Sequence, residues 1–210
     1  MKKATVQRHA GSNNRLASPI HRNDETVFQL RHGKISLYPF GRKELYSDEY
    51  LKWMNDPEIT KTIGRFDYLM PVSRRKLVEY FKHLDPVNTI FLAIYRANKA
   101  AKTKTDKGEF IGTIKIYDID ILARKASIGI LIGEKREWGK GYAQQAIGIV
   151  SQYIFDVLGL RKITAGYVSS NIGMERAFLK SGFIKEAVFK EHLFYAGELV
   201  DHVFVSKFRS

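Results

Sequence analysis

A short loop rich in glycine and positive charge is the stretch of this sequence best suited to chemistry. It runs from Arg136 to Ala143 and reads Arg-Glu-Trp-Gly-Lys-Gly-Tyr-Ala. Glycine lets the backbone come close to a phosphate, and the start of a helix presents unpaired N–H groups that carry partial positive charge. Arg136 and Lys140 add full charges beside them. The spacing therefore predicts an anion site for a phosphate-bearing ligand.

Two flanking elements must position this loop, and the pattern predicts both within residues 125–158. The Ile-rich run at 126–133 predicts a buried strand, and apolar residues three or four apart over 142–158 predict an amphipathic helix.

Two better-known phosphate-binding loops do not fit the sequence from Arg136 to Ala143. Gly141 stands where a P-loop needs Ser or Thr, and Gln144 stands where the Rossmann motif needs its third glycine. The alternative, that the glycines only serve a turn, stays open at this point.

A second helical stretch, residues 171–183, carries its own boundary signals. Asn171 is a residue type that caps helix starts, and Gly182 suits the left-handed conformation in which many helices end. The apolar residues at 162–168 predict a strand, and the helix before it makes this strand parallel to the one at 126–133.

Together these segments resemble the signatures of the GCN5-related N-acetyltransferase (GNAT) superfamily. The loop that begins at Arg136, Arg-x-x-Gly-x-Gly-Tyr-Ala, is similar to the loop in which that family grips the pyrophosphate of acetyl-coenzyme A. Residues 171–183 resemble its motif Asn-x-x-Ala/Ser-x-x-x-Tyr-x-x-x-Gly-Phe. Residues 53–58 and 192–201 resemble the branch that contains ribosomal-protein and spermidine acetyltransferases. The resemblance covers residues 27–208.

This resemblance implies a site for acetyl-CoA as co-substrate, with no metal. The pantetheine arm would pair with the strand at 126–133, in a gap where the strand at 162–168 splays away. The pyrophosphate would lie on the loop, and the adenosine phosphate near Lys180. The residues that the resemblance assigns to cofactor binding are Ile130, Leu131, Ile132, Arg136, Trp138, Gly139, Lys140, Gly141, Tyr142, Ala143, Asn171, Phe178 and Lys180.

The order of the expected elements favours a mixed α+β fold. Strands are expected at 35–40, 89–95, 109–118, 126–133, 162–168, 184–195 and 199–208, and helices at 49–54, 72–84, 142–158 and 171–183. Loops are expected at 61–71 and 98–108. In terms of the resemblance, this is a GNAT-like, mixed, splayed sheet of about seven strands, with its central strands flanked by helices.

The composition is that of a globular chain: 210 residues, 44% hydrophobic, with no cysteine. The missing cysteines exclude disulfides and cysteine-ligated zinc, and without a secretory signal or a long apolar stretch the expected location is cytoplasmic. Residues 1–26 lack apolar periodicity, and we interpret them as a flexible basic tail before a domain at 27–210. The net charge of +13 favours polyanionic ligands such as CoA or a nucleotide, and is poor support for a polyamine substrate.

The residues that commonly assist acetyl transfer in the family are replaced here. Its usual helix tyrosine is Phe178, and the two carboxylate positions in the splayed strands hold Ser127 and Gly166. The catalytic residues are therefore left unassigned, with Glu134 and His192 as candidate bases that would act through water.

The sequence thus predicts an N-acetyltransferase that moves an acetyl group from acetyl-CoA to a primary amine. The expected acceptor is an amino sugar on a nucleotide carrier or another small amine, or alternatively a protein N-terminus or lysine, as in ribosomal-protein acetylation. Loss of the usual helpers leaves open a CoA-binding module without turnover. A nucleic-acid-binding module is a further alternative, which no cluster of basic and aromatic residues favours. No membrane partner is expected, and a homodimer is left open.

Overall fold

The computed structural model describes residues 5–6, 29–61, 63, 70–97, 107–195 and 198–209. Most of the expected tail, and much of the two expected loops, lies outside the described residues. Within the tail, Thr5–Val6 forms a short strand, β1, which pairs with Leu30 and Arg31. No helix in the described part of the chain is long and apolar enough to cross a membrane.

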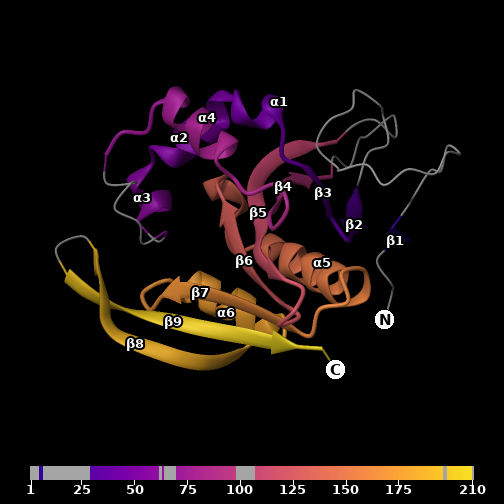
Figure 1. Ribbon diagram of the computed structural model, residues 1–210. Helices are drawn as coiled ribbons and strands as arrows, with labels where there is room; N and C mark the ends of the chain where they lie inside the picture. The colour runs from indigo at the N-terminus through magenta and orange to yellow at the C-terminus, as the bar shows by residue number, and fades with distance from the viewer. Residues whose placement is uncertain are drawn as a thin grey trace, which may run out of the picture.

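Nine strands of the described residues form one mixed sheet, in the order β1-β2-β3-β4-β5-β6-β7-β9-β8 (Figure 1). After β1, they are β2 (Leu30–His32), β3 (Ile35–Pro39), β4 (Ile90–Arg96), β5 (Glu109–Asp120), β6 (Lys125–Ile132), β7 (Lys162–Val168), β8 (Ile184–Tyr195) and β9 (Glu198–Phe208). The mixed fold and all seven expected strands are confirmed. The two additional strands are β1 and β2, which are short and lie at one edge, where a brief apolar pattern gives little signal.

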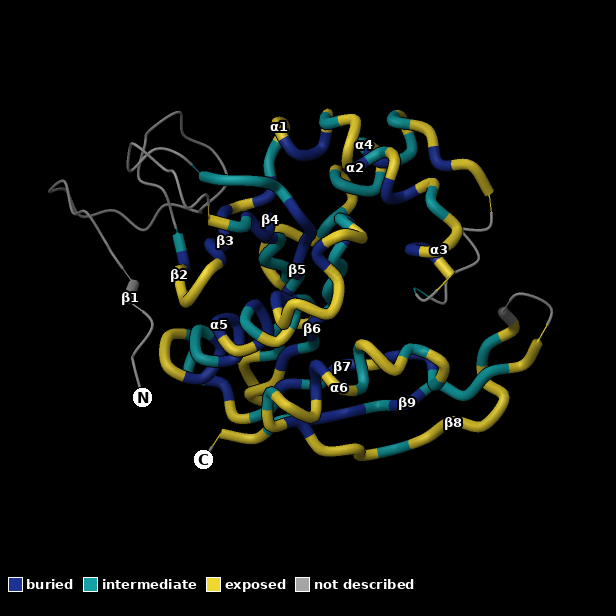
Figure 2. Tube along the Cα trace, turned by 180° about the vertical axis from the view of Figure 1, so that it is seen from behind, coloured by how far each residue is buried: buried dark blue, intermediate teal, exposed yellow. Residues whose placement is uncertain are grey.

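Helices lie on both faces of this sheet (Figures 1 and 2). The helices are α1 (Arg42–Leu45), α2 (Asp48–Met54), α3 (Pro57–Thr60), α4 (Arg74–Lys82), α5 (Tyr142–Asp156) and α6 (Ile172–Lys180), with a 3-10 turn at Lys135–Glu137. Side chains of α5 and α6 share a core with Leu37 and Ile94. Side chains of α1, α2 and α4 share a second core with Tyr38 and Tyr95, the next residues along the same strands. Successive strand residues point to opposite faces, so the two helix layers sandwich the sheet.

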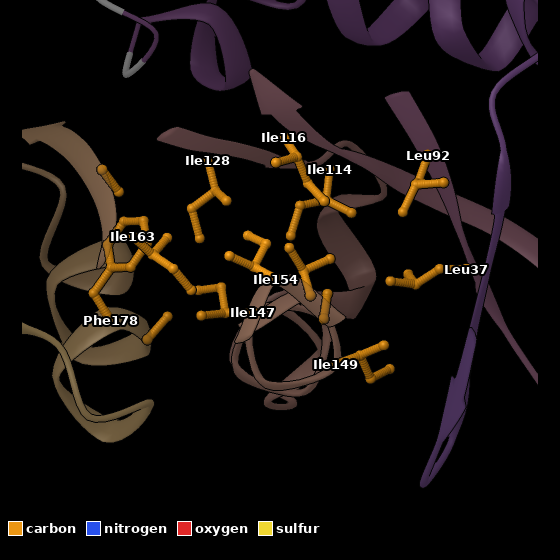
Figure 3. Packing of buried hydrophobic residues seen from close by; sticks show 14 of the residues in the cluster. Leu37, Leu92, Ile114, Ile116, Ile128, Ile147, Ile149, Ile154, Ile163 and Phe178 are labelled. Carbon is orange, nitrogen blue, oxygen red and sulfur yellow. The ribbon is translucent and has the colours of Figure 1, made fainter. Parts of the chain in front are cut away.

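The long helix α5 is the centre of the larger core. Ile147 and Ile154 are fully buried, and Figure 3 shows them among strand residues such as Ile128 and Ile163. Burying each such side chain stabilises the fold by about 1.5–3 kcal/mol. This packing fixes the start of α5 relative to β6 and β7.

The helices before β4 differ in part from expectation. The helix expected at 72–84 is α4, which begins after the cap Ser73, whose Oγ accepts from Lys76 N. A short helix that was not expected, α3, follows α2. Pro57 occupies its first position, and Asp56 Oδ1 accepts from Glu58 N at 2.9 Å. Proline is well suited to that first position because its missing N–H would have no helical partner.

The sheet opens between its two parallel strands. β6 and β7 pair over only three positions, Lys125 with Lys162, Ala126 with Ile163 and Ser127 with Thr164. Both strands then continue without pairing to each other, β6 to Ile132 and β7 to Val168. The expected splay is therefore present, and it leaves a gap that starts beyond Ser127 and Thr164.

Candidate active site

The gap presents backbone groups of β6. Gly133 N–H donates to Ile111 O at 3.0 Å, toward β5. Polar groups of successive residues in an antiparallel strand alternate in direction, so those of Ile132 and Ile130 face the gap. Leu131 instead directs its backbone toward β5 and packs its side chain against the smaller core. Of the three strand residues expected to meet a ligand, Ile130 and Ile132 therefore have the suitable direction and Leu131 does not.

Trp138 holds the loop against the end of β6. Its indole Nε1 donates to Ile132 O at 2.7 Å, while 41% of the residue remains exposed. The resemblance implied only a ligand-binding role for Trp138. The structure adds that it fastens the loop at the mouth of the gap.

Gly139 and Gly141 give the loop its path into α5. Their φ angles are +75° and +80°, in the left-handed region that favours glycine. A Cβ on either residue would meet no atom within 4 Å. Gly141 is the N-cap of α5, and no side chain caps this helix. The first N–H groups of α5 therefore have no side-chain acceptor, and such a helix start suits a phosphate.

Carboxylates engage both cations of the loop. Arg136 hydrogen-bonds to Glu109, and its Nε lies 3.4 Å from Glu134 Oε1. Lys140 Nζ lies 3.2 Å from Glu137 Oε2, and the Glu137 side chain is only 5% exposed. The loop charges are therefore held by ion pairs, an arrangement that the sequence did not reveal because Glu109 comes from a distant strand.

Glu109 lies at the centre of this network. Arg96 and Arg136 both donate to it. Burial alone would raise the pKa of the Glu109 carboxyl, but these two hydrogen bonds outweigh burial and hold the pKa below its ordinary value. Arg96 Nε also lies 3.5 Å from Glu137 Oε1. An incoming phosphate would meet cations that are already positioned, which lowers the entropy cost of binding.

Residues 53–58 connect the helix layer to the loop. Trp53 is 6% exposed, and a Cβ on Gly133 would come within 2.0 Å of its indole. Lys135 Nζ lies 2.8 Å from Asp56 Oδ2 and 2.9 Å from Glu58 Oε2. Residues 53–58 therefore pack on the end of β6 and bind Lys135, the residue just before the loop, by two ion pairs.

The residues expected on α6 fall in three different settings. Asn171 caps the helix, accepting from Met174 N at 3.1 Å, as expected. Lys180 is exposed, and its carbonyl accepts from Gln144 Nε2 at 3.4 Å, which places it beside the first turn of α5. Phe178 is 1% exposed and belongs to the larger core. Direct contact between these residues and a cofactor stays a prediction.

Two hydroxyl groups close the narrow end of the gap. Ser127 Oγ and Thr164 Oγ1 lie 2.9 Å apart. Both lie on the sheet face opposite α5 and α6, because Ile128 and Ile163 beside them point into the larger core. The face covered by α5 and α6 is filled by that core, so an acceptor would approach the gap from the face of Ser127 and Thr164, which we call the open face.

On this face, the β7 residue after Thr164 is Gly166, and His202 of β9 lies over it. A Cβ on Gly166 would come within 2.5 Å of His202 Nε2, and the imidazole packs against Phe204 with ring centroids 4.4 Å apart. Burial lowers the pKa of His202, and repulsion by His192 lowers it further. His202 was not among the site residues expected from the sequence. Its alternation with the core residue Val203 is the signal that places it on the open face.

The two candidate bases lie apart. Glu134 precedes the loop; its Oε1 lies 3.4 Å from Arg136 Nε, and its side chain is 26% exposed. His192 is exposed on β8, with its ring centroid 6.0 Å from that of His202. Within the ranges that the structure describes, no three His, Asp or Glu side chains gather as a metal site requires.

Comparison with known proteins leads to the same family as the motifs of the site. Residues 35–184 match the family described as "Acetyltransferase (GNAT) domain". The uncharacterized N-acetyltransferase YoaA of Bacillus subtilis is 32% identical over 114 residues, which are 53% of this chain and 64% of that protein. The matched stretch thus spans less than two thirds of YoaA. The probable N-acetyltransferase YjcK of the same organism is 29% identical over 136 residues, covering 64% of this chain and 70% of YjcK.

Solved structures share the fold. Spermidine N-acetyltransferase from Vibrio cholerae, in complex with CoA and spermine, has a TM-score of 0.70 at 22% identity and covers 83% of this chain and 95% of its own. Mycobacterium smegmatis RimJ, in complex with CoA-disulfide, also has a TM-score of 0.70, at 19% identity, with 87% and 86% covered. With the family match over residues 35–184, the splayed sheet and the glycine loop at α5, this chain belongs to the GNAT acetyltransferase family.

Proposed function

We propose that the protein is an acetyl-CoA-dependent N-acetyltransferase that moves an acetyl group to a primary amine. The observation that carries the proposal is the junction of an open anion site at the start of α5 with the gap between β6 and β7. A helix start binds a diphosphate, and an exposed strand edge binds an extended chain of amides. CoA carries both features in succession. The CoA bound to the spermidine N-acetyltransferase, and the CoA-disulfide bound to RimJ, support this choice.

The open face favours an acceptor with an anionic part. Tyr117 pairs with Ser127, and Lys115 pairs with Gly129, so both side chains lie on this face. Lys115 Nζ donates to Tyr80 OH at 2.9 Å and lies 4.7 Å from the Tyr117 ring centroid. A fixed ammonium repels the additional ammonium groups of a polyamine and attracts phosphate. With a net charge of +13, this supports an amino sugar on a nucleotide carrier as acceptor.

One observation favours a second acceptor class, a protein N-terminus or lysine. The β8–β9 hairpin exposes apolar side chains, including Phe194 at 70% and Leu199 at 56%. An extended peptide could pack against such a surface. Both classes use the same donor site, so they differ only in what approaches the open face.

The donor part is tested by thermal unfolding with acetyl-CoA. A ligand that binds only the native state at 100 times its dissociation constant adds about 2.7 kcal/mol to the free energy of unfolding. We expect a clear rise in Tm with acetyl-CoA or CoA and none with adenosine. An unchanged Tm at saturating acetyl-CoA contradicts the proposal.

The acceptor part is tested by measuring CoA thiol release with three amines. These are an amino sugar linked to a nucleoside diphosphate, spermidine, and a short peptide with a free N-terminus. We expect the highest kcat/KM with the nucleotide-linked amino sugar. Preference for the peptide selects the second class, and preference for spermidine overturns the charge argument based on Lys115.

A further inference from the structure

We infer that His202 is the catalytic base that takes a proton from the acceptor ammonium. This inference rests on the proposed function. An alkyl ammonium such as that of lysine has a pKa of about 10.4, so at neutral pH nearly all of it is charged and cannot attack a carbonyl. The positions at which the resemblance places catalytic helpers hold Phe178, Ser127 and Gly166, whose side chains cannot accept this proton near neutral pH. A base must therefore come from elsewhere.

The first argument is position. Ser127 and Thr164 mark the start of the gap, and Gly166 follows Thr164 by two residues, about 7 Å farther along β7. His202 belongs to β9, on the far side of β7, where it pairs with Val168. Its Nε2 nevertheless reaches within 2.5 Å of the point where a Gly166 side chain would begin. The imidazole therefore extends from β9 over β7, toward the gap.

The second argument is the fit between Gly166 and His202. The backbone of Gly166 is not in a left-handed conformation, so its φ angle does not require glycine. Glycine is required by packing, because any Cβ would collide with the His202 imidazole. A residue that lacks a side chain thus makes room for a histidine from the neighbouring strand.

The third argument is the surroundings of the imidazole. Phe204 lies 4.4 Å away between ring centroids, and His192 on β8 lies 6.0 Å away. On the same face, the β7 neighbours are Thr164, Gly166 and Val168, and Phe189 of β8 pairs with His202 from the other side; none of these carries a charge. Asp201, next in sequence, is held by Lys190 at 2.8 Å on the other side of the strand. Partial burial, with a smaller contribution from His192, lowers the pKa of His202 and so favours the neutral imidazole, the form that accepts a proton.

With His202 as the base, the protons and bonds of the transfer balance. The acceptor ammonium gives one proton to a ring nitrogen of His202, directly or through one water, and His202 passes it to solvent. The neutral amine forms a bond to the acetyl carbon, and the bond from that carbon to sulfur breaks. The leaving sulfur takes the second proton of the nitrogen. The products are an amide, free CoA thiol and one proton, as the charge of the reactants requires.

His202→Gln is the primary test, because glutamine keeps a planar polar side chain but cannot take the proton. With the fastest amine of the three-member panel, we expect kcat/KM at pH 7 to fall by about 100-fold or more. The rise of kcat/KM with pH through a pKa below 6.5 should disappear, while the dissociation constant of CoA stays unchanged. His32→Gln, an exposed histidine of β2, is the matched control and should keep parental rates.

Proton NMR of the histidine C2–H gives a readout that needs no substrate. His202 should titrate below 6.5, and its signal is identified by its loss in His202→Gln. In His192→Gln the pKa of His202 should rise, because a repelling charge is removed. The acid limb of the pH profile of kcat/KM should then move to higher pH. A base at His192 would instead make His192→Gln the inactive variant, which overturns the inference.

Gly166→Ala decides the matter if His202→Gln does not fold. The added methyl group must displace the imidazole, so we expect a large loss of kcat/KM with CoA binding retained. Gly148→Ala, which meets nothing within 4 Å on α5, is its control. An unchanged rate and pH profile in both His202→Gln and Gly166→Ala overturns the inference alone. Failure of the parent protein to acetylate any panel amine overturns the proposed function and this inference with it.

Discussion

Gly141 meets two requirements in one residue: a left-handed backbone and an open space before α5. We expect Gly141→Val to weaken CoA binding more than Lys140→Ala, because the valine strains φ and fills the space for the phosphate. Lys140 is half exposed, so its screened charge contributes only about 0.5–1 kcal/mol. Arg136→Ala should fall between the two.

Calorimetric titration of CoA into these variants gives their order directly. Gly148→Val is the control, since it adds the same side chain to an exposed helical glycine with nothing within 4 Å. Parental CoA affinity in Gly141→Val would show that the phosphate is not held at this helix start.

Gly133 shows the opposite situation, a glycine required by packing. Gly133→Ala puts a methyl group within 2.0 Å of the Trp53 indole, and such overpacking typically costs about 1–3 kcal/mol of unfolding free energy. Gly129→Ala on the same strand meets only Tyr117 at 3.6 Å and should cost much less. Denaturant unfolding measures both. Trp53→Leu should recover part of the loss in Gly133→Ala, and equal stability of the two alanine variants would contradict this account.

Features of single residues that depend only on neighbours in the chain could be predicted from the sequence. The cap at Asn171, the left-handed Gly182 and the helix after Gly141 all follow from neighbours in the chain. His202 and the carboxylate of Glu109 were not found, because each acts on residues far away in sequence. Only strand order and register bring them to the gap and the loop.

At the scale of elements, Asn55 fastens the end of α2 to the segment before α4. Its Nδ2 donates to Leu51 O and Val72 O, each at 2.9 Å, and its Oδ1 accepts from Val72 N at 2.7 Å. Asn55→Ala removes all three bonds and leaves a part-buried N–H unsatisfied, at a cost of about 1–3 kcal/mol. Asn88→Ala, which loses one exposed side-chain bond to Asp85, should cost less when both are measured by thermal unfolding. Equal losses would show that this clamp adds nothing.

The elements missed by the sequence are the short ones. α1 and α3 have four residues each, too few for an apolar period to show. The long helix α5 and the strands around it carry a strong pattern, which is why the sheet was predicted, whereas its splay was implied only by the resemblance to the GNAT superfamily. Element length, more than element type, separated what was predicted from what was not.

For the whole molecule, we expect removal of residues 1–26 to leave folding and CoA binding intact. The loop, the gap and both cores lie within residues 30–205, and the described part of the tail adds only the two-residue strand β1 at the sheet edge. Removal of residues 1–4 keeps β1 and is the matched control. Denaturant unfolding and CoA titration compare the two truncations. An insoluble protein, or a large loss confined to the longer truncation, would make the tail part of the fold.

The short pairing of β6 with β7 has a consequence for how the molecule transmits strain. Three residue pairs form a seam between a six-strand portion and a three-strand portion of the sheet. Beyond that seam, a ligand chain bound in the gap would complete the sheet as an additional strand. The co-substrate would then be a mechanical part of the fold, and a change in β9 would alter how tightly the loop at α5 holds it. By thermodynamic reciprocity, filling the gap would in turn alter the rigidity of the β8–β9 hairpin.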